Sequence, residues 1–497
     1  SHRSPPTAPM PTKPPVPIRE KLVAASAALT LAYSAWGFGG VIAWSLHIML
    51  AGGLVTFFLA VLPFPKTFSL STFHLPLQSP RRLARTPAFY FIALFLSYLA
   101  IAAANPTWRI VSDNRGWWLA AVEARLMAWL PGSVDAPYEP MNAWRIFNHH
   151  LAAFSLALGL KIGLKHRRMI LLVLWSMVGS GVAMAAVGIA QHFSGAEKVL
   201  WTMASENPRF WGSFFYRNQG AAFLYWIIVV AAVLYFYHLR QAREKAALGG
   251  PHFLAFAFIG IVLVSNAFAI SRAGILISAA LVAAFLAIIL LDAAVHLFRA
   301  RHSWKNSLVV GLLLTLLFSS GSYLLVQSVD WGRVEERLGS GDRIKQELKT
   351  GDRVMLRKAT LEMAQDQILT GWGPGSFRYV FPMYQQKYPE LFYSDWLVYQ
   401  GEKGRDFYRY AHTDLVQFLA EYGIVGVSLL ALSVLSLLLP SLRLGAFWLG
   451  LFLLLGVACI VVHAFLDFIF HSPSVWTAFI GSLGAVGRLV QLDRCRA

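Results

Sequence analysis

The sequence has few charged residues and almost no cysteine. Charged side chains make up 14% of its 497 residues and hydrophobic ones 57%, whereas a soluble globular protein has about 25% charged residues. This balance excludes a soluble protein and indicates a polytopic membrane protein. The two cysteines, Cys459 in an apolar run and Cys495 in the basic tail, do not predict a structural disulfide. The sequence has no signal-peptide cleavage pattern, so we expect the first apolar segment to be a retained span.

Acidic residues are also scarce. The chain has 25 Asp and Glu against 43 Lys and Arg, which gives a net charge of +18. In a soluble protein this excess would suggest nucleic-acid binding. In a membrane protein it marks loops that face the anionic lipid of the cytoplasmic leaflet. We therefore expect membrane lipids, and no nucleic acid, as partners.

Long apolar runs define the predicted fold, since about 20 helical residues cross a bilayer. One run of about 45 residues, Phe253 to Leu297, is interrupted at Ser271 and Arg272 and counts as two spans. We expect a hairpin tip there, with Ser271 as N-cap and Arg272 as the first residue of the returning helix. The sequence thus predicts an all-α polytopic membrane protein with about twelve transmembrane helices. They lie near residues 20–36, 41–62, 87–104, 147–164, 169–190, 219–238, 253–270, 273–297, 307–327, 413–439, 444–465 and 473–490.

Basic residues orient this predicted bundle. With twelve spans, the loops rich in Lys and Arg all fall on one side, which the positive-inside rule makes cytoplasmic. The main loop on the other side, residues 328–411, has thirteen Lys and Arg against twelve Asp and Glu, as expected of a translocated segment. We therefore expect both termini in the cytoplasm and Arg272 at the outer face, which is the periplasm in a Gram-negative cell.

The same topology divides the chain into five segments. We expect a disordered cytoplasmic N-terminus at residues 1–19 and spans one to nine at 20–327. A partly helical periplasmic loop domain follows at 328–411, then spans ten to twelve at 412–490 and a cytoplasmic tail at 491–497. No internal repeat is evident, which disfavours a transporter built from inverted repeats.

The predicted outer loops carry the candidate chemistry. In the tryptophan-rich loop at 105–145, the segment Gly116 to Leu130 predicts an amphipathic helix at the membrane interface. In the next loop, Asn218 can cap span six and place Arg217 against the positive end of that helix. The long loop contains a predicted amphipathic helix at 352–367 and then a glycine motif at 371–377, which allows close backbone approach to a ligand. The aromatic residues that follow suit either sugar stacking or a membrane interface.

Two histidine segments complete the candidate site. His412 begins span ten, and a helix N-terminus disfavours imidazolium, so a neutral imidazole can accept a proton there. A cap or core role for His412 is the alternative. His463, Asp467 and His471 are spaced by four and predict one helix face near the outer end of span eleven. We expect them to support the site, with a metal site as the alternative.

Three motifs resemble the bacterial O-antigen ligase and polymerase superfamily from Arg209 onward. They are Phe215-Tyr-Arg-Asn-Gln-Gly220, Ser271-Arg-Ala-Gly274, and a glycine-rich loop followed by His412-Thr-Asp-Leu-Val-Gln-Phe-Leu-Ala-Glu-Tyr-Gly-Ile-Val-Gly426. The His463 to Asp467 segment also resembles the late His-x-x-x-Asp segment of that family. Thr413 departs from the family pattern, which usually has Asn, Ser or Gln after the histidine.

The resemblance implies a membrane glycosyltransferase of the GT-C type in the bacterial inner membrane. Such an enzyme transfers a glycan from undecaprenyl diphosphate to a hydroxyl at the periplasmic face, with inversion and without a metal or other cofactor. By position, Arg217 and Arg272 would hold the donor diphosphate and His412 would be the general base. The expected supporting residues are Asn218, Ser271, Tyr410, His463 and Asp467.

The sequence is compatible with more than one class of acceptor. A ligase would use lipid A–core or a similar glycolipid, whereas a polymerase would extend the glycan and a protein O-oligosaccharyltransferase would modify protein. A polysaccharide transporter or flippase is the alternative from another class, and twelve spans suit it by number. The polar residues, however, gather at one predicted face instead of the middle of the bilayer.

The predicted topology can be tested with reporter fusions. A fusion at Arg301 should report a cytoplasmic location and one at Glu390 an external location, because an odd number of spans separates them. A phosphatase reporter that is active only outside the cytoplasm, paired with a fluorescent reporter active only inside, measures this. Equal signals from the two positions would contradict the topology.

Overall fold

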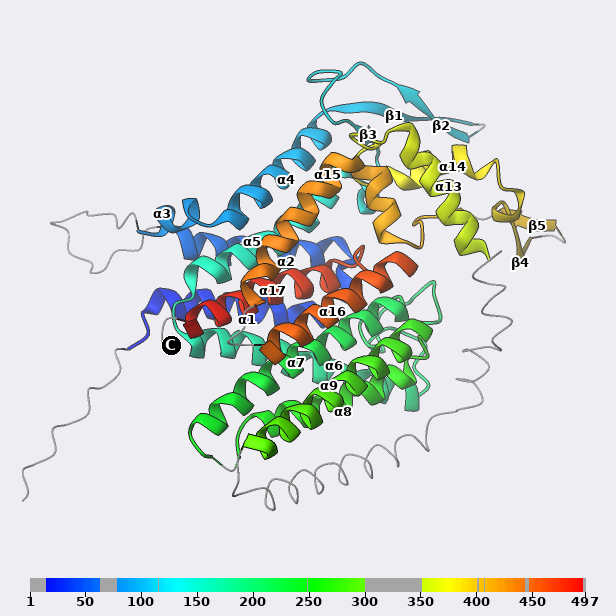
Figure 1. Cartoon of the computed structure of the whole chain (residues 1–497). Helices are drawn as coiled ribbons and strands as arrows, with labels where there is room; N and C mark the ends of the chain where they lie inside the picture. Colours follow the sequence, from blue (N-terminus) through cyan, green and yellow to red (C-terminus); the bar gives the residue numbers. More distant parts are fainter. Residues whose placement is uncertain are drawn as a thin grey trace, which may run out of the picture.

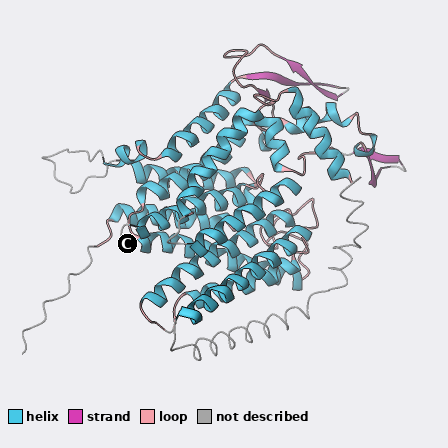
Figure 2. Cartoon of the chain, in the orientation of Figure 1, coloured by secondary structure: helices cyan, strands magenta, loops and turns pink. Residues whose placement is uncertain are grey.

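The computed structural model describes residues 15–62, 78–114, 116–247, 249–299, 351–399, 402–405, 407–442 and 447–494. Within them the chain is mainly helical, and the few strands lie at one margin of the molecule (Figure 2). The predicted all-α polytopic class is therefore confirmed. The predicted ninth span, residues 307–327, lies outside the described residues.

Long helices run side by side and form the body of the molecule (Figure 1). They are α1 (Ile18–Ser34), α2 (Ala43–Val61), α4 (Pro87–Ala104), α5 (Ala143–Gly163), α6 (Arg167–Phe193), α7 (Arg217–Glu244), α8 (His252–Phe268), α9 (Arg272–Arg299), α15 (Asp414–Leu438), α16 (Phe447–Leu466) and α17 (Pro473–Arg494). Shorter helices are α3 (Gln78–Ala84), α13 (Asp352–Asp366) and α14 (Phe377–Gln385). Each described span prediction corresponds to one long helix, and the starts differ by about one turn at most.

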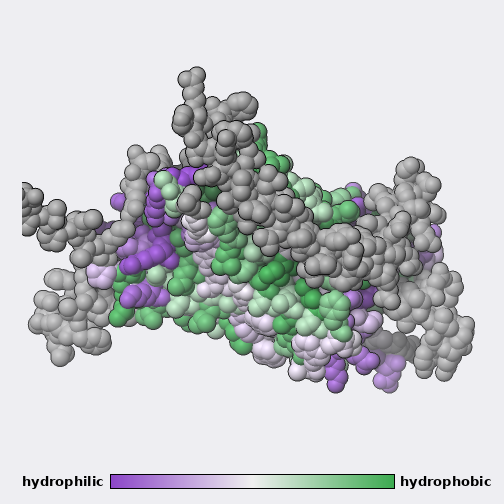
Figure 3. All heavy atoms as spheres, turned by 90° about the horizontal axis from the view of Figure 1, so that it is seen from below, coloured by the Kyte–Doolittle hydropathy of each residue, from purple (hydrophilic) through white to green (hydrophobic). Residues whose placement is uncertain are grey.

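Eight of these helices are long and apolar enough to cross a membrane, counting described residues alone. They are α2, α4, α6, α7, α9, α15, α16 and α17. Helix α8 is apolar but shorter, and α5 carries Arg145, His149, His150 and Lys161. In one view of the surface, a hydrophobic zone separates hydrophilic residues at the two ends of the molecule (Figure 3), as expected of a bundle that crosses a bilayer.

Helix α7 forms the centre of the bundle. Its residues from Gln219 to Tyr237 are all buried, and it packs against α6, α8, α9, α16 and α17. A helix that is apolar all round is stable where neighbours surround it. The first residue of α7 is Arg217, so the most enclosed helix of the fold fixes the position of that residue.

Two chain segments outside the long helices share a second, smaller core. One holds the sheet of β1 (Pro106–Asp113), β2 (Gly116–Ala121) and β3 (Ser133–Asp135), and the other holds α13 and α14. Their shared core includes Val134, Met141, Leu356, Met363 and Phe377. Strands β4 (Tyr393–Tyr399) and β5 (Glu402–Arg405) form a separate hairpin.

The predicted amphipathic helix over Gly116 to Leu130 is wrong. Gly116 to Ala121 forms β2, which pairs with β1 in antiparallel register, Trp118 opposite Val111. The next residues are irregular up to β3. The sequence Gly-Trp-Trp-Leu at the start of β2 is aromatic and suits a strand, and pairing with β1 decided against the helical pattern.

The glycine motif at 371–377 joins this smaller core to the bundle. Gly371, Gly373 and Gly375 all have positive φ (71°, 98° and 73°), and the loop they form binds the first part of α15. Helix α15 has a kink at Gly423, whose φ is 62° and ψ −177°. A Cβ on Gly371 would lie 2.3 Å from the carbonyl oxygen of Glu421. The close backbone approach predicted for these glycines is therefore made to the protein itself.

Replacing Gly371 by Ala should destabilise the fold more than replacing Gly195 by Ala. Both glycines have positive φ, but a Cβ on Gly195 would meet nothing within 4 Å. The left-handed conformation costs each variant about 1–2 kcal/mol, and the backbone clash adds roughly 1–3 kcal/mol for Gly371 alone. The thermal unfolding midpoint of the detergent-solubilised protein measures the difference. Equal midpoints for the two variants would contradict the close packing of Gly371 against the backbone of α15.

Candidate functional site

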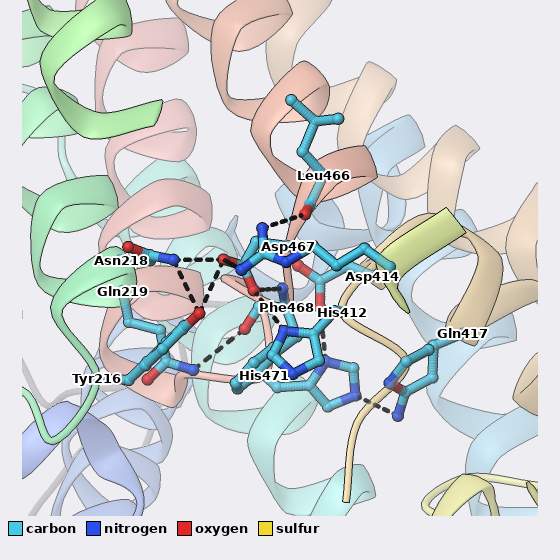
Figure 4. A network of polar contacts seen from close by, with 12 residues as sticks. Tyr216, Asn218, Gln219, His412, Asp414, Gln417, Leu466, Asp467, Phe468 and His471 are labelled. Carbon is cyan, nitrogen blue, oxygen red and sulfur yellow. Dashed lines mark hydrogen bonds and ion pairs between the residues drawn. The ribbon is translucent and has the colours of Figure 1, made fainter. Parts of the chain in front are cut away.

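The Asp467 carboxylate connects several helix ends at one end of the bundle. Asp467 follows the last residue of α16 and its side chain is 2% exposed. Its Oδ2 accepts hydrogen bonds from the Tyr216 hydroxyl at 3.1 Å and from Asn218 Nδ2 at 2.5 Å. Its Oδ1 accepts from its neighbour's backbone, Phe468 N, at 2.9 Å. These contacts hold both carboxylate oxygens in fixed directions (Figure 4).

His412 pairs with this carboxylate. His412 Nδ1 lies 3.3 Å from Asp467 Oδ1, and its side chain is 29% exposed. The backbone of His412 has φ of 51°, a left-handed conformation that costs energy in a residue other than glycine and is frequent at functional sites. A carboxylate that accepts the Nδ1 proton fixes the tautomer of the ring, so Nε2 is the nitrogen that can accept a proton.

The N-terminal ends of α7 and α9 meet beside Asp467. The Ser271 hydroxyl donates to Asn218 Oδ1 at 2.8 Å, while the amide group of Asn218 donates to Asp467. Arg217 and Arg272 are the first residues of the two helices. Through these side-chain hydrogen bonds, the starts of both arginine-bearing helices are connected to the carboxylate that binds His412. Helix N-termini and guanidinium groups both favour an anion.

The two predicted caps have different outcomes. Ser271 caps α9 as predicted, since its Oγ accepts from the backbone N–H of Gly274 at 3.3 Å. The predicted cap by Asn218 is wrong: α7 begins at Arg217, so Asn218 lies inside its first turn and binds Asp467. Both ends of the Asn218 amide have other partners: Nδ2 donates to the charged Asp467 carboxylate, and Oδ1 accepts from the Ser271 hydroxyl.

Burial and charge oppose each other at Asp467. Burial alone raises the pKa of this carboxyl, but the hydrogen bond from His412 and the positive charge of Arg353 outweigh it and hold the pKa below its usual range. For Tyr216, burial and the charge of Asp467 both raise the pKa of the hydroxyl. The result is an ionised Asp467 that accepts from a protonated Tyr216.

Three aromatic rings form a stack across the site. Phe468 lies between Tyr216 and Tyr410, with ring centroids 4.9 Å and 4.5 Å apart and interplanar angles of 11° and 7°. The His412 ring meets the edge of the same Phe468 at 4.7 Å. Burial raises the pKa of Tyr410 to about 12. Tyr410, one of the expected supporting residues, thus contacts the same Phe468 ring that meets His412.

A second polar network lies next to the first and is more deeply buried. His471 Nδ1 binds Asp414 Oδ1 at 2.6 Å, and Gln417 Nε2 lies 2.9 Å from His471 Nε2. Gln417 also donates to Glu421 at 3.0 Å. The Glu421 carboxylate in turn accepts from the backbone N–H groups of Gly375 and Phe377 in the glycine loop. This network connects the smaller core to the start of α15.

The prediction that His463, Asp467 and His471 share one helix face is wrong, because α16 ends at Leu466. The three side chains have separate partners: His463 binds the Tyr225 hydroxyl at 3.0 Å, Asp467 binds His412, and His471 binds Asp414. In the described part of the chain, no group of three or more His, Cys, Asp or Glu side chains is arranged to hold a metal ion.

The family model described as O-Antigen ligase matches residues 210–431. The chain carries an O-antigen ligase family domain. Its matched range begins just before α7 and ends within α15, so it includes Arg217, Arg272 and His412 and stops short of Asp467. A search of curated proteins gives no match.

The O-antigen ligase domain and the apolar helices identify a bacterial membrane protein of the ligase and polymerase type. The predicted superfamily is thereby confirmed. Residues outside the matched range complete the site, since Asp467 lies in the connection between α16 and α17. Two contributors were missed from the sequence: Arg353, which contacts Asp467 from α13, and Glu421, which anchors the glycine loop. Both residues lie in segments that the sequence analysis singled out. Their contacts, however, are with residues more than 40 positions away, and such contacts leave no local pattern in the sequence.

The ionised Asp467 predicts a pH-dependent contribution to stability. Its folded-state pKa lies below the unfolded value of about 3.9, so the stabilisation is complete above that pH and is lost as the pH falls toward the folded-state pKa. The variant Asp467→Asn should unfold at lower temperature than the wild type at pH 7, by an amount that shrinks below about pH 4. Thermal unfolding in detergent across this range measures it, and a gap that widens toward acid pH would contradict the prediction.

Proposed function

We propose that this protein transfers a glycan from undecaprenyl diphosphate to an acceptor hydroxyl at the periplasmic face of the inner membrane. Lipid A–core or a similar glycolipid is the proposed acceptor. One observation supports this most strongly: the buried carboxylate of Asp467 binds His412 and, through Asn218 and Ser271, the helix starts that carry Arg217 and Arg272. A base and two cationic helix starts at one place suit transfer from a diphosphate donor.

Arg217 and Arg272 are the proposed diphosphate ligands. Each guanidinium group can bind phosphate oxygens in a bidentate manner, and each helix start adds the positive end of its helix dipole. As the bond between the anomeric carbon and the diphosphate oxygen breaks, the electron pair moves to the leaving undecaprenyl diphosphate. Positive groups fixed in place beforehand stabilise this developing charge without having to reorganise.

His412 is the proposed general base. Asp467 accepts the Nδ1 proton and leaves Nε2 to take the proton of the acceptor hydroxyl as its oxygen bonds to the anomeric carbon. Asp467 also stabilises the imidazolium that results. A single displacement of this kind inverts the anomeric centre. General-base assistance of a weak nucleophile such as a sugar hydroxyl is worth roughly 10²–10⁴-fold in rate.

The distribution of basic residues supports a periplasmic site. Helix α7 has 28 residues, so at 1.5 Å per residue it separates its two ends by about 42 Å. At the end remote from Arg217, Arg240 pairs with Asp493, Arg167 pairs with Asp493 at 2.7 Å, and Arg243 pairs with Asp292 at 2.6 Å. Basic residues concentrate on the cytoplasmic side of membrane proteins, which supports a site on the opposite side.

The acceptor is best identified by deleting the gene and analysing the cell-envelope glycans. A ligase predicts that long chains accumulate on the lipid carrier while the final acceptor stays unmodified. Accumulated single repeat units would favour a polymerase, and loss of glycan from protein would favour an O-oligosaccharyltransferase. Unchanged glycans together with altered solute uptake would contradict the enzyme and favour a transporter.

Substitution of Arg217, Arg272 or His412 by Ala should abolish complementation of that deletion while the protein remains in the membrane. Each loss removes a charge or base used in the transition state, so a fall of at least about 100-fold is expected. Arg109→Ala is the matched control, since Arg109 is a half-exposed arginine of β1 paired with Asp135. Near-normal glycan transfer by all three site variants would refute the proposed site.

A further inference from the structure

Arg353 approaches the candidate site from outside the helical bundle. It is the second residue of α13, and its Nη2 lies 3.5 Å from Asp467 Oδ2. Its Nη1 donates to the carbonyl oxygen of Leu466, the last residue of α16, at 3.3 Å. The side chain is half exposed, whereas that of Asp467 is almost fully buried. A cation of the smaller core thus reaches the carboxylate at the centre of the site.

A neighbouring arginine holds the same helix by a different contact. Arg357 lies one turn after Arg353 and its guanidinium group sits 4.4 Å from the centroid of the Phe465 ring. This cation–π contact fastens α13 to α16 and does not involve Asp467. The smaller core is also fastened to α15 through the glycine loop. The docking of α13 therefore has anchors other than Arg353, so the contact with Asp467 calls for a separate explanation.

We propose that Arg353 is a positioning residue for glycan transfer, which fixes the Asp467 carboxylate so that its Oδ1 faces His412. This inference rests on the proposed function. Oδ2 is held by Arg353 together with Tyr216 and Asn218, and Oδ1, which also accepts from the backbone N–H of Phe468, faces His412. The extramembrane segment that carries α13 then completes the reaction centre, in addition to any part it has in acceptor choice.

Charge explains why an arginine is needed at this position. A carboxylate that is removed from water requires hydrogen bonds and opposite charge to remain ionised. Tyr216 and Asn218 are neutral donors, and His412 must be neutral before it accepts the proton of the acceptor. Arg353 supplies positive charge throughout the cycle. An ionised Asp467 can therefore orient the neutral imidazole first and stabilise the imidazolium afterwards.

The test compares Arg353→Gln, Arg357→Gln and Asp467→Asn with the double variant Arg353→Gln/Asp467→Asn. The purified full-length proteins are assayed with lipid-linked glycan and unmodified acceptor extracted from the deletion strain, and release of undecaprenyl diphosphate is followed. Arg353→Gln should lower kcat on the order of tenfold with an unchanged KM for the donor. Arg357→Gln should be close to wild type, since that arginine only contributes to docking.

The double variant should be no slower than Asp467→Asn alone, because residues that act through one another give non-additive effects. Three outcomes would each overturn the proposal. They are losses that multiply in the double variant, equal losses in Arg353→Gln and Arg357→Gln, and a raised KM for the glycan donor with unchanged kcat in Arg353→Gln. The last outcome would indicate instead that Arg353 binds the lipid-linked glycan donor. Two results in the same assay separate the two hypotheses: if the wild type releases no undecaprenyl diphosphate when acceptor is present, the proposed function itself fails, whereas an inactive His412→Ala beside a normal Arg353→Gln refutes the positioning role alone.

Discussion

The need to satisfy one buried negative charge organises the end of the bundle that holds the candidate site. The carboxylate of Asp467 is 2% exposed, and an unpaired charge at such depth would cost several kcal/mol. Its donors come from the start of α7, from the residue before the α15 cap, and from α13. These three segments lie far apart in the sequence. The packing of these segments against one another therefore places the groups that compensate the charge.

The glycine loop performs a similar task for the second buried acid. Glu421 accepts hydrogen bonds from two backbone N–H groups of the loop, and the loop and α15 approach each other closely enough that Cβ atoms at Gly371 or Gly423 would clash with carbonyl oxygens. Backbone packed on backbone leaves little freedom for rigid-body movement. The smaller core is thus attached firmly to the helix that begins just after His412. This attachment holds α13, and with it Arg353, close to Asp467.

The sequence predicted the elements well and their side-chain contacts poorly. Apolar runs identified the helices, and the break at Ser271 and Arg272 located the start of α9, because these signals are local. The role of Asp467 was underestimated because its spacing from His463 suggested one helix face, whereas α16 ends at Leu466. Asn218 appeared to be a cap for the same reason: the local pattern allowed it, and a carboxylate about 250 residues away changed its partner. The β1–β2 pairing that replaced the predicted helix is likewise decided by a neighbouring strand.

The structure also distinguishes between two similar acid–imidazole pairs. Asp414 binds His471 at 2.6 Å and Asp467 binds His412 at 3.3 Å, and a backbone hydrogen bond from Asp414 to the Asp467 carbonyl joins the two pairs. The His471 side chain is 5% exposed and its Nε2 already meets Gln417, whereas that of His412 is 29% exposed. A base must be reachable by its substrate, so the accessible pair suits proton transfer. The enclosed pair, tied through Gln417 to Glu421 and the glycine loop, suits holding the start of α15 in place beneath it.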